Sequence, residues 1–290
     1  MINGKCIIVF NSEKKHAEKL LDDVDSFLNN DRSIQTVIYR YCQSEGDENS
    51  SKKLPEEILK NLDSTDFIIS IGGDGTLLYA ARLFAPAGLP IIGVNVGKLG
   101  FITEASGDEL KEEIMGFLNG ENQISERMML EAVIFRKGKH LSSFYALNDI
   151  VIGKNSLSRI SKIETSINGN YICTYEADGL VVSTPTGSTA YNLSAGGPIM
   201  HPGIHAMILT PICNHSLRVR PLVISDTSHV KARLLSRYPN ERLVADGQEW
   251  AGLEYEDEIF IKKSPFSVKM VKSSRRDFFE ILKTKLHWID

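Results

Sequence analysis

The sequence lacks the features that mark secreted, membrane-spanning and nucleic-acid-binding proteins. Its four cysteines are scattered and form no C-x-x-C pair, which argues against structural zinc and is typical of a reducing compartment. No apolar run reaches the roughly 18 residues of a membrane helix, and the first apolar stretch stops at Asn11, too soon for a signal peptide. The formal net charge of -4 leaves no basic excess for nucleic acid. We therefore expect a soluble cytoplasmic protein that binds neither nucleic acid nor membranes.

Several familiar signatures of catalysis and nucleotide binding are absent as well. No G-x-x-x-x-G-K-[ST] loop occurs, and no G-x-G-x-x-G follows the first strand-like run, which argues against a P-loop NTPase and a standard NAD dehydrogenase. Without a G-x-S-x-G elbow, a hydrolase triad has no anchor. His201 and His205 have a zinc-like spacing, but Pro202-Gly203 between them breaks a helix. We expect no metal site built from protein side chains.

What is present is enough apolar material for two folded domains, with 42% hydrophobic residues in a chain of 290. Up to about residue 120, short apolar runs alternate with segments of helical spacing. The expected strands are 5–10, 34–39, 66–71 and 90–94, and the expected helices are 16–29, 55–62, 76–84 and 108–118. Apolar strands that alternate with amphipathic helices predict an α/β domain with a parallel sheet covered on both faces.

After about residue 125 strand-like runs follow one another directly, which predicts a mainly β domain. The expected strands are 128–136, 143–152, 162–167, 171–175, 179–183, 217–223, 229–235, 242–245, 258–262 and 267–271. Asn168-Gly169 between two of these runs indicates a hairpin with a type I′ turn. Phe278, Phe279, Leu282 and Leu286 have helical spacing, so we expect a C-terminal helix that returns to the first domain. The expected domains are 1–125 and 126–265, with 266–290 as the returning segment.

The most informative short motif is Gly72-Gly73-Asp74-Gly75-Thr76, which directly follows an expected parallel strand. Ligands bind at the carboxyl ends of such strands, and a glycine-rich turn before a helix suits phosphate. The glycines are expected to reach unusual backbone angles and to clear space for a ligand. Asp74 is the one ionisable side chain in the turn. It either stabilises the turn, or takes a proton from an attacking hydroxyl or helps hold Mg²⁺; the doubled glycine favours function.

A second region, 184–189, is a hydroxyl-rich turn between an expected strand and a short helix. Its hydroxyls can cap the helix, but four of them exceed what a cap needs, which favours ligand binding. Tyr191, just beyond, can stack on an adenine or fill the core.

These residues resemble known kinases. The GGDGT sequence is shared by NAD kinases, lipid kinases of the diacylglycerol and sphingosine type and, more loosely, phosphofructokinases. The block 178–198, DGLVVSTPTGSTAYNLSAGGP, closely resembles the long signature of the NAD kinases in particular. Three shorter segments match further motifs of that family in order: 95–101, Asn148-Asp149 and Asp246-Gly247-Gln248. The family usually has Asn-Glu where this chain has Asn148-Asp149, one methylene shorter.

The resemblance implies transfer of the γ-phosphate of ATP, or of another polyphosphate donor, to the 2′-hydroxyl of the adenosine ribose of NAD. Asp74 would be the catalytic base. Asn148 and Asp149 would bind NAD, the carboxylate through sugar hydroxyls, and Asp178 would contact its nicotinamide end, either within one subunit or across a subunit boundary. The remaining residues implied to bind the substrates are Gly72, Gly73, Gly75, Phe101, Thr186, Thr189, Ala190, Tyr191, Asn192, Leu193, Ser194 and Gln248.

The family also implies Mg²⁺ bound with ATP and a homodimer or homotetramer. Two other functions stay open at the level of sequence. A lipid kinase that shares only the GGDGT loop predicts an apolar or basic membrane-facing surface, which the sequence does not show. A non-catalytic dinucleotide-binding regulator predicts binding without turnover, and the intact Asp74 argues against it.

Overall fold

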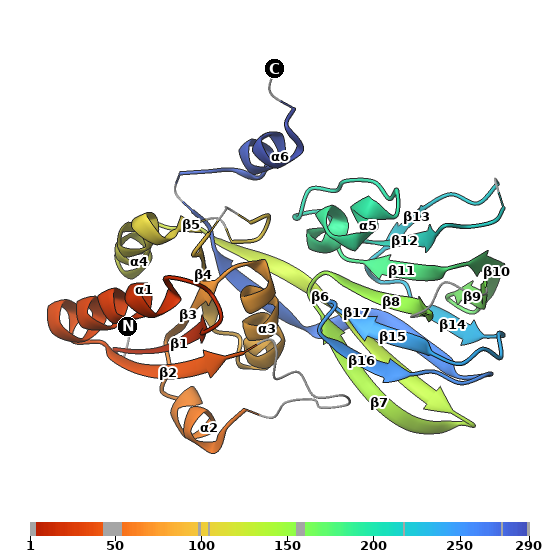
Figure 1. Cartoon of the computed structure of the whole chain (residues 1–290), viewed down its shortest axis with the longest axis horizontal. Helices are drawn as coiled ribbons and strands as arrows, with labels where there is room; N and C mark the ends of the chain where they lie inside the picture. The colour runs from red at the N-terminus through yellow and green to blue at the C-terminus, as the bar shows by residue number, and fades with distance from the viewer. Residues whose placement is uncertain are drawn as a thin grey trace. The chain divides into compact units, whose positions relative to one another are not determined.

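The computed structural model describes residues 4–42, 54–97, 100–103, 105–154, 160–216, 218–273 and 275–288. They form two compact units. Unit 1 holds the described residues of 1–46, 52–127 and 267–290, and unit 2 holds those of 128–266. Each unit is an independent arrangement of the elements labelled in Figure 1.

Unit 1 is an α/β fold around a parallel sheet. Its strands lie in the order β2-β1-β3-β4, all parallel, and the far end of β17 pairs in parallel with β4 through Lys269 and Met270. The strands are β1 (Lys5–Asn11), β2 (Gln35–Tyr41), β3 (Phe67–Gly72), β4 (Pro90–Asn95) and the short β5 (Ala105–Ser106) beside β4. The α-helices are α1 (Ala17–Ser26), α2 (Glu56–Leu62), α3 (Asp74–Phe84), α4 (Leu110–Leu118) and α6 (Phe278–Leu286).

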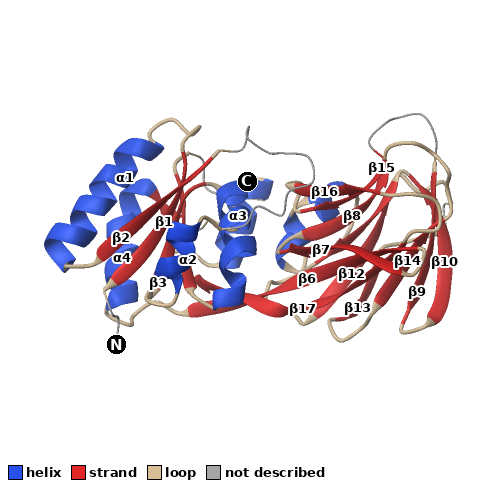
Figure 2. Ribbon diagram, turned by 90° about the horizontal axis from the view of Figure 1, so that it is seen from below, coloured by secondary structure: helices blue, strands red, loops and turns tan. Residues whose placement is uncertain are grey.

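Helices cover both faces of this sheet, as Figure 2 shows. Alternate residues of the strands, Ile8 and Ile69 among them, point to one face and form a single core with α1 and α4. Leu21 and Val24 are part of the stripe with which α1 faces that core. On the opposite face α3 contacts β1, β3 and β4. Strands buried on both faces read as continuous apolar runs, which is why they were evident in the sequence.

The C-terminal helix α6 begins at a capping box. The Asp277 carboxylate accepts a hydrogen bond from Glu280 N (2.8 Å), and the Glu280 carboxylate accepts one from Asp277 N (3.1 Å). Just before it, Arg276 donates two hydrogen bonds to Glu109 at the start of α4 (2.8 and 2.7 Å). These contacts hold the C-terminal segment in unit 1.

Unit 2 is built from two antiparallel sheets. One has the order β13-β12-β11-β8-β15-β16, and the other contains β10-β9-β14-β17 together with β6 and β7. The first comprises β8 (Asp149–Lys154), β11 (Gly179–Ser183), β12 (Ala206–Ile212), β13 (Leu222–Ser225), β15 (Glu241–Ala245) and β16 (Glu249–Gly252). The second comprises β6 (Ile124–Arg136), β7 (Lys139–Ala146), β9 (Ser161–Ile167), β10 (Asn170–Ala177), β14 (Val230–Leu234) and β17 (Glu258–Val271).

One apolar core joins the inner faces of the two sheets. Alternate residues such as Ile150 and Ile152 of β8 meet others such as Val230 and Ala232 of β14, all fully or almost fully buried. A 3₁₀ turn, Thr186–Thr189, and the short helix α5 (Tyr191–Ser194) follow β11. The expected hairpin turn is confirmed: Asn168 and Gly169 have φ of 51° and 82° between the antiparallel β9 and β10.

The expected fold class is confirmed, an α/β domain with a parallel sheet, a mainly β domain and a C-terminal helix, but several strand assignments were wrong. The run 143–152 is two strands, β7 and β8, separated by a turn at Leu147-Asn148. The runs 258–262 and 267–271 form one long strand, β17. The strand expected at 217–223 is observed at Leu222–Ser225, with Leu217 outside the described residues. Strands β12 and β16 were not expected from the sequence.

Candidate active site

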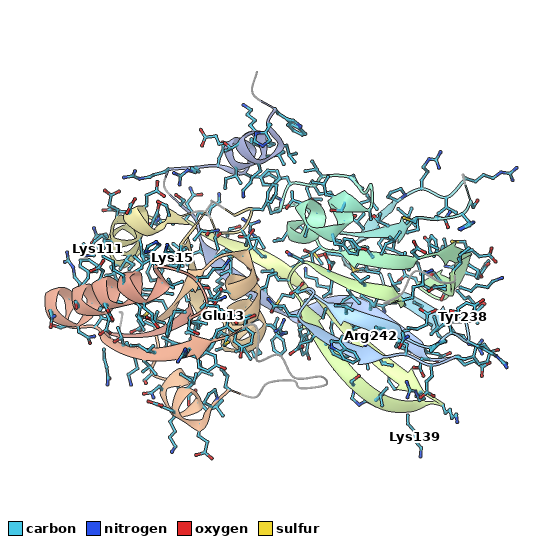
Figure 3. All side chains as sticks on the ribbon, viewed as in Figure 1. Glu13, Lys15, Lys111, Lys139, Tyr238 and Arg242 are labelled. Carbon is cyan, nitrogen blue, oxygen red and sulfur yellow. The ribbon has the colours of Figure 1, made fainter. Side chains whose placement is uncertain are left out.

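The parallel sheet of unit 1 places two loops together at its carboxyl edge. The strand order reverses between β1 and β3, because β2 lies on one side of this pair and β4 on the other. A crevice forms at such a reversal, and ligands of open α/β sheets bind there. The loop after β1 carries Glu13 and Lys15 (Figure 3), and the loop after β3 carries the glycine-rich turn. The topology therefore points to this edge as a ligand site.

The glycines of the turn serve close packing. The sequence predicted that they would adopt unusual backbone angles, and this was wrong for Gly73, whose φ of 169° is ordinary extended backbone. Neither Gly72 nor Gly75 has a positive φ. A side chain at Gly72 would instead overlap with the Thr76 hydroxyl, and its Cβ would lie 3.2 Å from the Cβ of Asn11 on β1. Gly72 is needed because α3 starts immediately behind the strand.

Asp74 is the first residue of α3, and its carboxylate is held by the segment 101–103. Oδ2 accepts one hydrogen bond, from Phe101 N (2.8 Å). Oδ1 accepts from Thr103 Oγ1 (2.8 Å), Thr103 N (3.0 Å) and Ile102 N (3.3 Å). The same Thr103 hydroxyl accepts a hydrogen bond from Asn95 Nδ2 (3.1 Å), so β4 also supports the arrangement. The carboxylate is therefore fixed in direction before any substrate arrives.

In this arrangement the Asp74 carboxylate keeps one acceptor position that the segment 101–103 does not use. A carboxylate has about four acceptor positions on its two oxygens. Oδ1 is saturated, whereas Oδ2 accepts a single N–H. Oδ2 is thus the atom able to accept a proton from an attacking hydroxyl. The structural interpretation of Asp74 is confirmed, since the side chain stabilises its loop, and the catalytic interpretation stays a prediction that the open acceptor position on Oδ2 allows.

Gly100 explains why this loop can approach so closely. A Cβ at Gly100 would overlap with both Asp74 Oδ1 and Thr103 Oγ1. Phe101 also receives Lys285 from α6 over its ring, at 5.7 Å from the centroid. Within unit 1 the structure thus brings together Gly72, Gly73, Asp74, Gly75 and Phe101. Lys98, in the matched segment 95–101, lies outside the described residues.

In unit 2 the hydroxyl-rich turn is used mostly for structure. Thr184 Oγ1 donates to Leu147 O (2.6 Å) and accepts from Gly187 N (3.0 Å). Ser188 Oγ accepts from Met200 N (2.6 Å) and donates to the same residue's carbonyl (3.1 Å). Thr186 differs: its buried hydroxyl has no hydrogen-bond partner in the described part of the chain. An unpaired buried hydroxyl is costly, so Thr186 is the member of this turn that a ligand would satisfy.

The turn that carries Asn148 and Asp149 packs against the hydroxyl-rich turn. Thr184 N donates to Asn148 O (2.9 Å), and a side chain at Gly187 would overlap with the Asn148 backbone. Among the described residues Asn148 Oδ1 is a buried acceptor without a donor. Burial, together with the negative charge of Asp246, raises the pKa of Asp149 to about 7. This turn therefore offers a free amide oxygen next to a carboxyl group that changes charge near neutrality.

Two other predicted residues line a cavity of about 580 Å³ in unit 2. Asp178 and Tyr191 share its wall with Lys154, Cys213 and Trp250. Lys154 Nζ lies 3.0 Å from Asp178 Oδ1 and neutralises its charge. Tyr191 is 45% exposed, which answers the question left open by the sequence, since this ring is not part of the core. Its exposed face is available for stacking.

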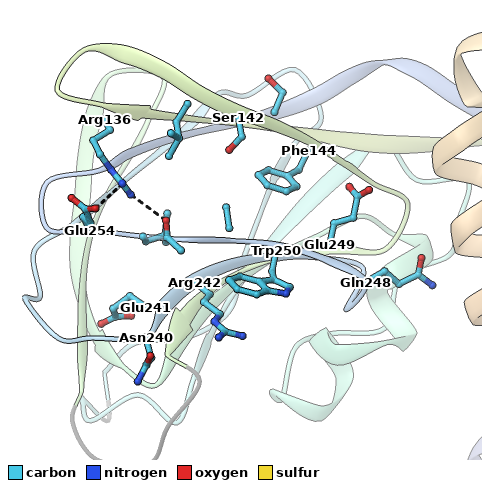
Figure 4. A pocket seen from close by; sticks show the side chains of 15 residues that line it. Arg136, Ser142, Phe144, Asn240, Glu241, Arg242, Gln248, Glu249, Trp250 and Glu254 are labelled. Atoms are coloured by element: carbon cyan, nitrogen blue, oxygen red, sulfur yellow. Dashed lines mark hydrogen bonds and ion pairs between the residues drawn. The ribbon is translucent and has the colours of Figure 1, made fainter. Parts of the chain in front are cut away.

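Gln248 lines a different and larger cavity of about 860 Å³, shown in Figure 4. Trp250 belongs to both cavities, and the Arg242 guanidinium lies 3.8 Å from the centroid of its ring. At the far end Arg136 is neutralised by Glu254 (2.7 Å) and Asp257 (2.8 Å). The structure therefore separates Gln248 from the cavity wall that Asp178 and Tyr191 form.

The remaining predicted residues lie in or beside α5. The Asn192 side chain is fully buried: its amide donates to Ser188 O (3.0 Å) and Pro198 O (3.1 Å), and its oxygen accepts from Thr210 Oγ1 (2.6 Å). It therefore has no polar atom left for a ligand. Thr189 Oγ1 bonds to Thr186 O (3.4 Å). Ala190 and Leu193 are half-buried and Ser194 is exposed.

Two residues outside the predicted set are now part of the site. Thr103 holds Asp74 in unit 1, and Asp246 accepts hydrogen bonds from the backbone of Leu147, Asn148 and Asp149 in unit 2. The matched Asp246-Gly247-Gln248 motif marked the second region, but nothing in the sequence shows which atoms Asp246 meets. No helix in the described ranges has the length and apolar character to cross a membrane. No cluster of three or more potential metal ligands occurs in those ranges.

Comparison with known proteins shows the family to which the chain belongs. Residues 6–122 match the ATP-NAD kinase N-terminal domain, and residues 147–273 match the ATP-NAD kinase C-terminal domain. The NAD kinase of Syntrophotalea carbinolica is 47% identical over 223 residues, covering 77% of this chain and 78% of the relative. That of Citrifermentans bemidjiense is 44% identical over 265 residues, covering 88% and 91%.

Two solved structures share the fold. Yeast NADH kinase complexed with NADH has a TM-score of 0.83 at 22% identity, covering 98% of this chain and 87% of that one. An NAD kinase from Archaeoglobus fulgidus in complex with ATP has a TM-score of 0.74 at 23% identity, covering 99% and 100%. The lipid-kinase alternative finds no support in these comparisons. The chain belongs to the ATP-NAD kinase family.

Proposed function

We propose that this protein transfers the γ-phosphate of ATP to the 2′-hydroxyl of the adenosine ribose of NAD, with Asp74 as the catalytic base. The observation that carries the proposal is the Asp74 carboxylate, which is fixed by the segment 101–103 and keeps an acceptor position on Oδ2. Membership of the ATP-NAD kinase family identifies NAD as the phosphate acceptor and ATP as the phosphate donor. In a regulator that binds the dinucleotide without turnover, a fixed aspartate with an open acceptor position would serve no purpose.

The chemical step follows from the position of Asp74. The 2′-oxygen attacks the γ-phosphorus while its proton passes to Oδ2 of Asp74. The bond between the γ-phosphorus and the bridging oxygen breaks, and ADP leaves with the electron pair. Catalysis in such transfers comes mostly from positioning and charge neutralisation, and the base adds a factor of about 10²–10⁴.

For NAD we propose a site in unit 2 at the turn of Asn148 and Asp149. The unpaired Asn148 Oδ1 and Thr186 Oγ1 support it, because bound ligand groups would satisfy both. The Asp149 carboxylate would accept hydrogen bonds from sugar hydroxyls, and Tyr191 would stack on a ring of the dinucleotide. Asp178 would meet the nicotinamide end in the 580 Å³ cavity. We propose that four further residues contact NAD through backbone atoms or by shaping its pocket: Asn192, Ala190, Leu193 and Ser194.

Mg²⁺ bound with the triphosphate completes the proposal. When bound, it would neutralise phosphate charge, and the N–H groups of the glycine turn would face the phosphates beside it. The one open position of Asp74 Oδ2 is needed for the proton of the 2′-hydroxyl, so the cation would be held by triphosphate oxygens and water, ligands that Mg²⁺ commonly takes. We also propose a cytoplasmic homodimer or homotetramer. None of the four cysteines, all of them among the described residues, forms a disulfide, which supports a reducing compartment.

The direct test is the formation of NADP by the purified chain from NAD, ATP and Mg²⁺. We expect turnover that stops when EDTA removes the divalent cation. Phosphorus NMR of the product must place the new phosphate at the 2′ position. A folded wild-type protein that binds NAD but makes no NADP would contradict the proposal and favour the regulator.

A further inference from the structure

The turn between β7 and β8 is held by a carboxylate from a distant part of the chain. Asp246 follows β15 and lies close to a hundred residues further along the sequence. Its Oδ2 accepts from Leu147 N (2.8 Å), and its Oδ1 accepts from Asn148 N (2.8 Å) and Asp149 N (3.1 Å). The backbone N–H of Asp246 in turn donates to Asp149 O (3.0 Å). One side chain thus fixes three successive peptide units.

The local backbone of Asp246 is adapted to this contact. Asp246 and Gly247 have φ of 50° and 67°, so both lie in the left-handed region at the β15–β16 turn. Asp and Asn tolerate this region better than other side chains. An Asn would keep the backbone but offer a single accepting oxygen, whereas Asp accepts on both. The three N–H groups therefore require a carboxylate at this position.

We propose that Asp246 is a positioning residue for NAD, which sets the direction of the Asn148 and Asp149 side chains by clamping the N–H groups of their turn. The inference rests on the proposed function of that turn. Asn148 Oδ1 has no donor among the described residues, so the direction of this amide is determined by its backbone. The clamp supplies that backbone with three charge-assisted hydrogen bonds.

The clamp also acts on the charge of Asp149. The groups that face Asp149 are Asp246 from the β15–β16 turn and the Tyr191 N–H from α5; the Tyr191 ring in turn feels Asp178 and Cys213. Ser183, its partner on β11, carries no charge. Because Asp246 contributes to the raised pKa of Asp149, removing its charge lowers that pKa. A shift of the pH dependence of NAD binding therefore reports the charge of Asp246, and a rise in KM for NAD without a rise in KM for ATP reports its positioning role.

The experiment compares the full-length wild type with Asp246→Asn in NADP formation between pH 5.5 and 9, varying NAD and ATP separately. We expect KM for NAD to rise about 10- to 100-fold, as for the loss of a hydrogen bond to a charged group. KM for ATP should stay within about twofold, and the acid limb of kcat/KM for NAD should move to lower pH. Calorimetry with NAD alone should show the same loss of affinity.

Asp226→Asn is the matched control. Asp226 is also a buried aspartate in a turn of unit 2, but its partners are Lys263 (2.6 Å) and His205 (3.3 Å). It should leave both KM values and the pH profile unchanged. If Asp246→Asn fails to fold, Asp246→Gly, which tolerates the positive φ at this position, is measured by the same criteria. An unchanged KM for NAD and an unmoved acid limb in an active, folded variant overturn the positioning role. A wild type that binds NAD but makes no NADP contradicts the proposed function instead, and calorimetry still tests the clamp.

Discussion

Gly100→Ala should disable the kinase although it leaves every side chain that we assign to catalysis in the sequence. The added Cβ would come closer than 3.0 Å to both Asp74 Oδ1 and Thr103 Oγ1. Since Asp74 opens a helix and Thr103 bonds to Asn95, neither side chain can turn away freely. The loop must move outward by about 1 Å to restore an ordinary contact distance.

The magnitude follows from what that movement breaks. Overpacking costs about 1–3 kcal/mol of unfolding free energy. Each hydrogen bond from Thr103 to the carboxylate contributes about 1.5–3 kcal/mol, and both stretch when the loop moves. A misplacement of about 1 Å at a reacting group lowers the rate about 100-fold, so we expect kcat to fall by that factor.

The assay is NADP formation at saturating NAD and ATP, at a temperature where denaturation curves show the variant folded. Gly252→Ala is the control, because a Cβ there meets no atom within 4 Å and its φ is not positive. It should keep wild-type kcat and stability. A folded Gly100→Ala protein with kcat within about twofold of wild type would refute the idea that the loop fixes Asp74.

Three further predictions concern charge and hydroxyl groups. The pKa of Asp149 lies at about 7, above its ordinary 3.8, so its protonation stabilises the fold at low pH and this is lost as pH rises through 7. The free energy of unfolding of Asp149→Asn, measured with urea, should therefore rise relative to that of wild type between pH 5 and 8, by at most about 4 kcal/mol. The Arg276 hydrogen bonds lower the pKa of Glu109 to about 2 from 4.5. The ionised Glu109 therefore stabilises the folded protein above pH 4.5, and this stabilisation is lost as pH falls toward 2. Glu109→Gln should cost at most about 3 kcal/mol at pH 7 and less toward pH 3, whereas Glu56→Gln, in an exposed pair, should cost nothing measurable. Thr186→Val should raise KM for NAD about two- to tenfold and leave the unfolding midpoint intact, because the hydroxyl has no partner to lose in the described structure.

Each of these predictions has an outcome that contradicts it. A constant difference between Asp149→Asn and wild type across pH would show that Asp149 titrates normally. Equal effects of Glu109→Gln and Glu56→Gln would remove the buried ion pair from the stability of unit 1. A lower midpoint for Thr186→Val with an unchanged KM would assign that hydroxyl to folding.

The sequence predicts the architecture well where local pattern and burial agree. The inner strands of unit 1, β1, β3 and β4, are buried on both faces, so their apolar runs were visible, and the Asn168-Gly169 turn follows from its backbone angles. The turn at Leu147-Asn148 was missed because it is only two residues long and strand-like residues lie on both sides of it. The strand Ala206–Ile212 was missed because it follows a Pro-Gly turn and contains Pro211.

The sequence motifs pointed to the candidate site residues, but they did not predict which atoms those residues contact. Asp74 stood out as the charge in a glycine turn, but its donors lie 27–29 residues away, beyond α3 and β4. The clamp by Asp246 spans 97–99 residues and depends on two turns meeting in three dimensions. Asn192 shows the converse: its place in a binding signature reflects packing of α5, since its amide bonds only inside the protein.

The most direct test of the mechanism is the rate of the chemical step in Asp74→Asn, measured in a single turnover with NAD, ATP and Mg²⁺. An amide cannot take the proton of the 2′-hydroxyl, so we expect the rate to fall about 10²- to 10⁴-fold while calorimetry shows NAD binding within about threefold of wild type. A wild-type rate in this variant would show that the 2′-hydroxyl loses its proton without Asp74.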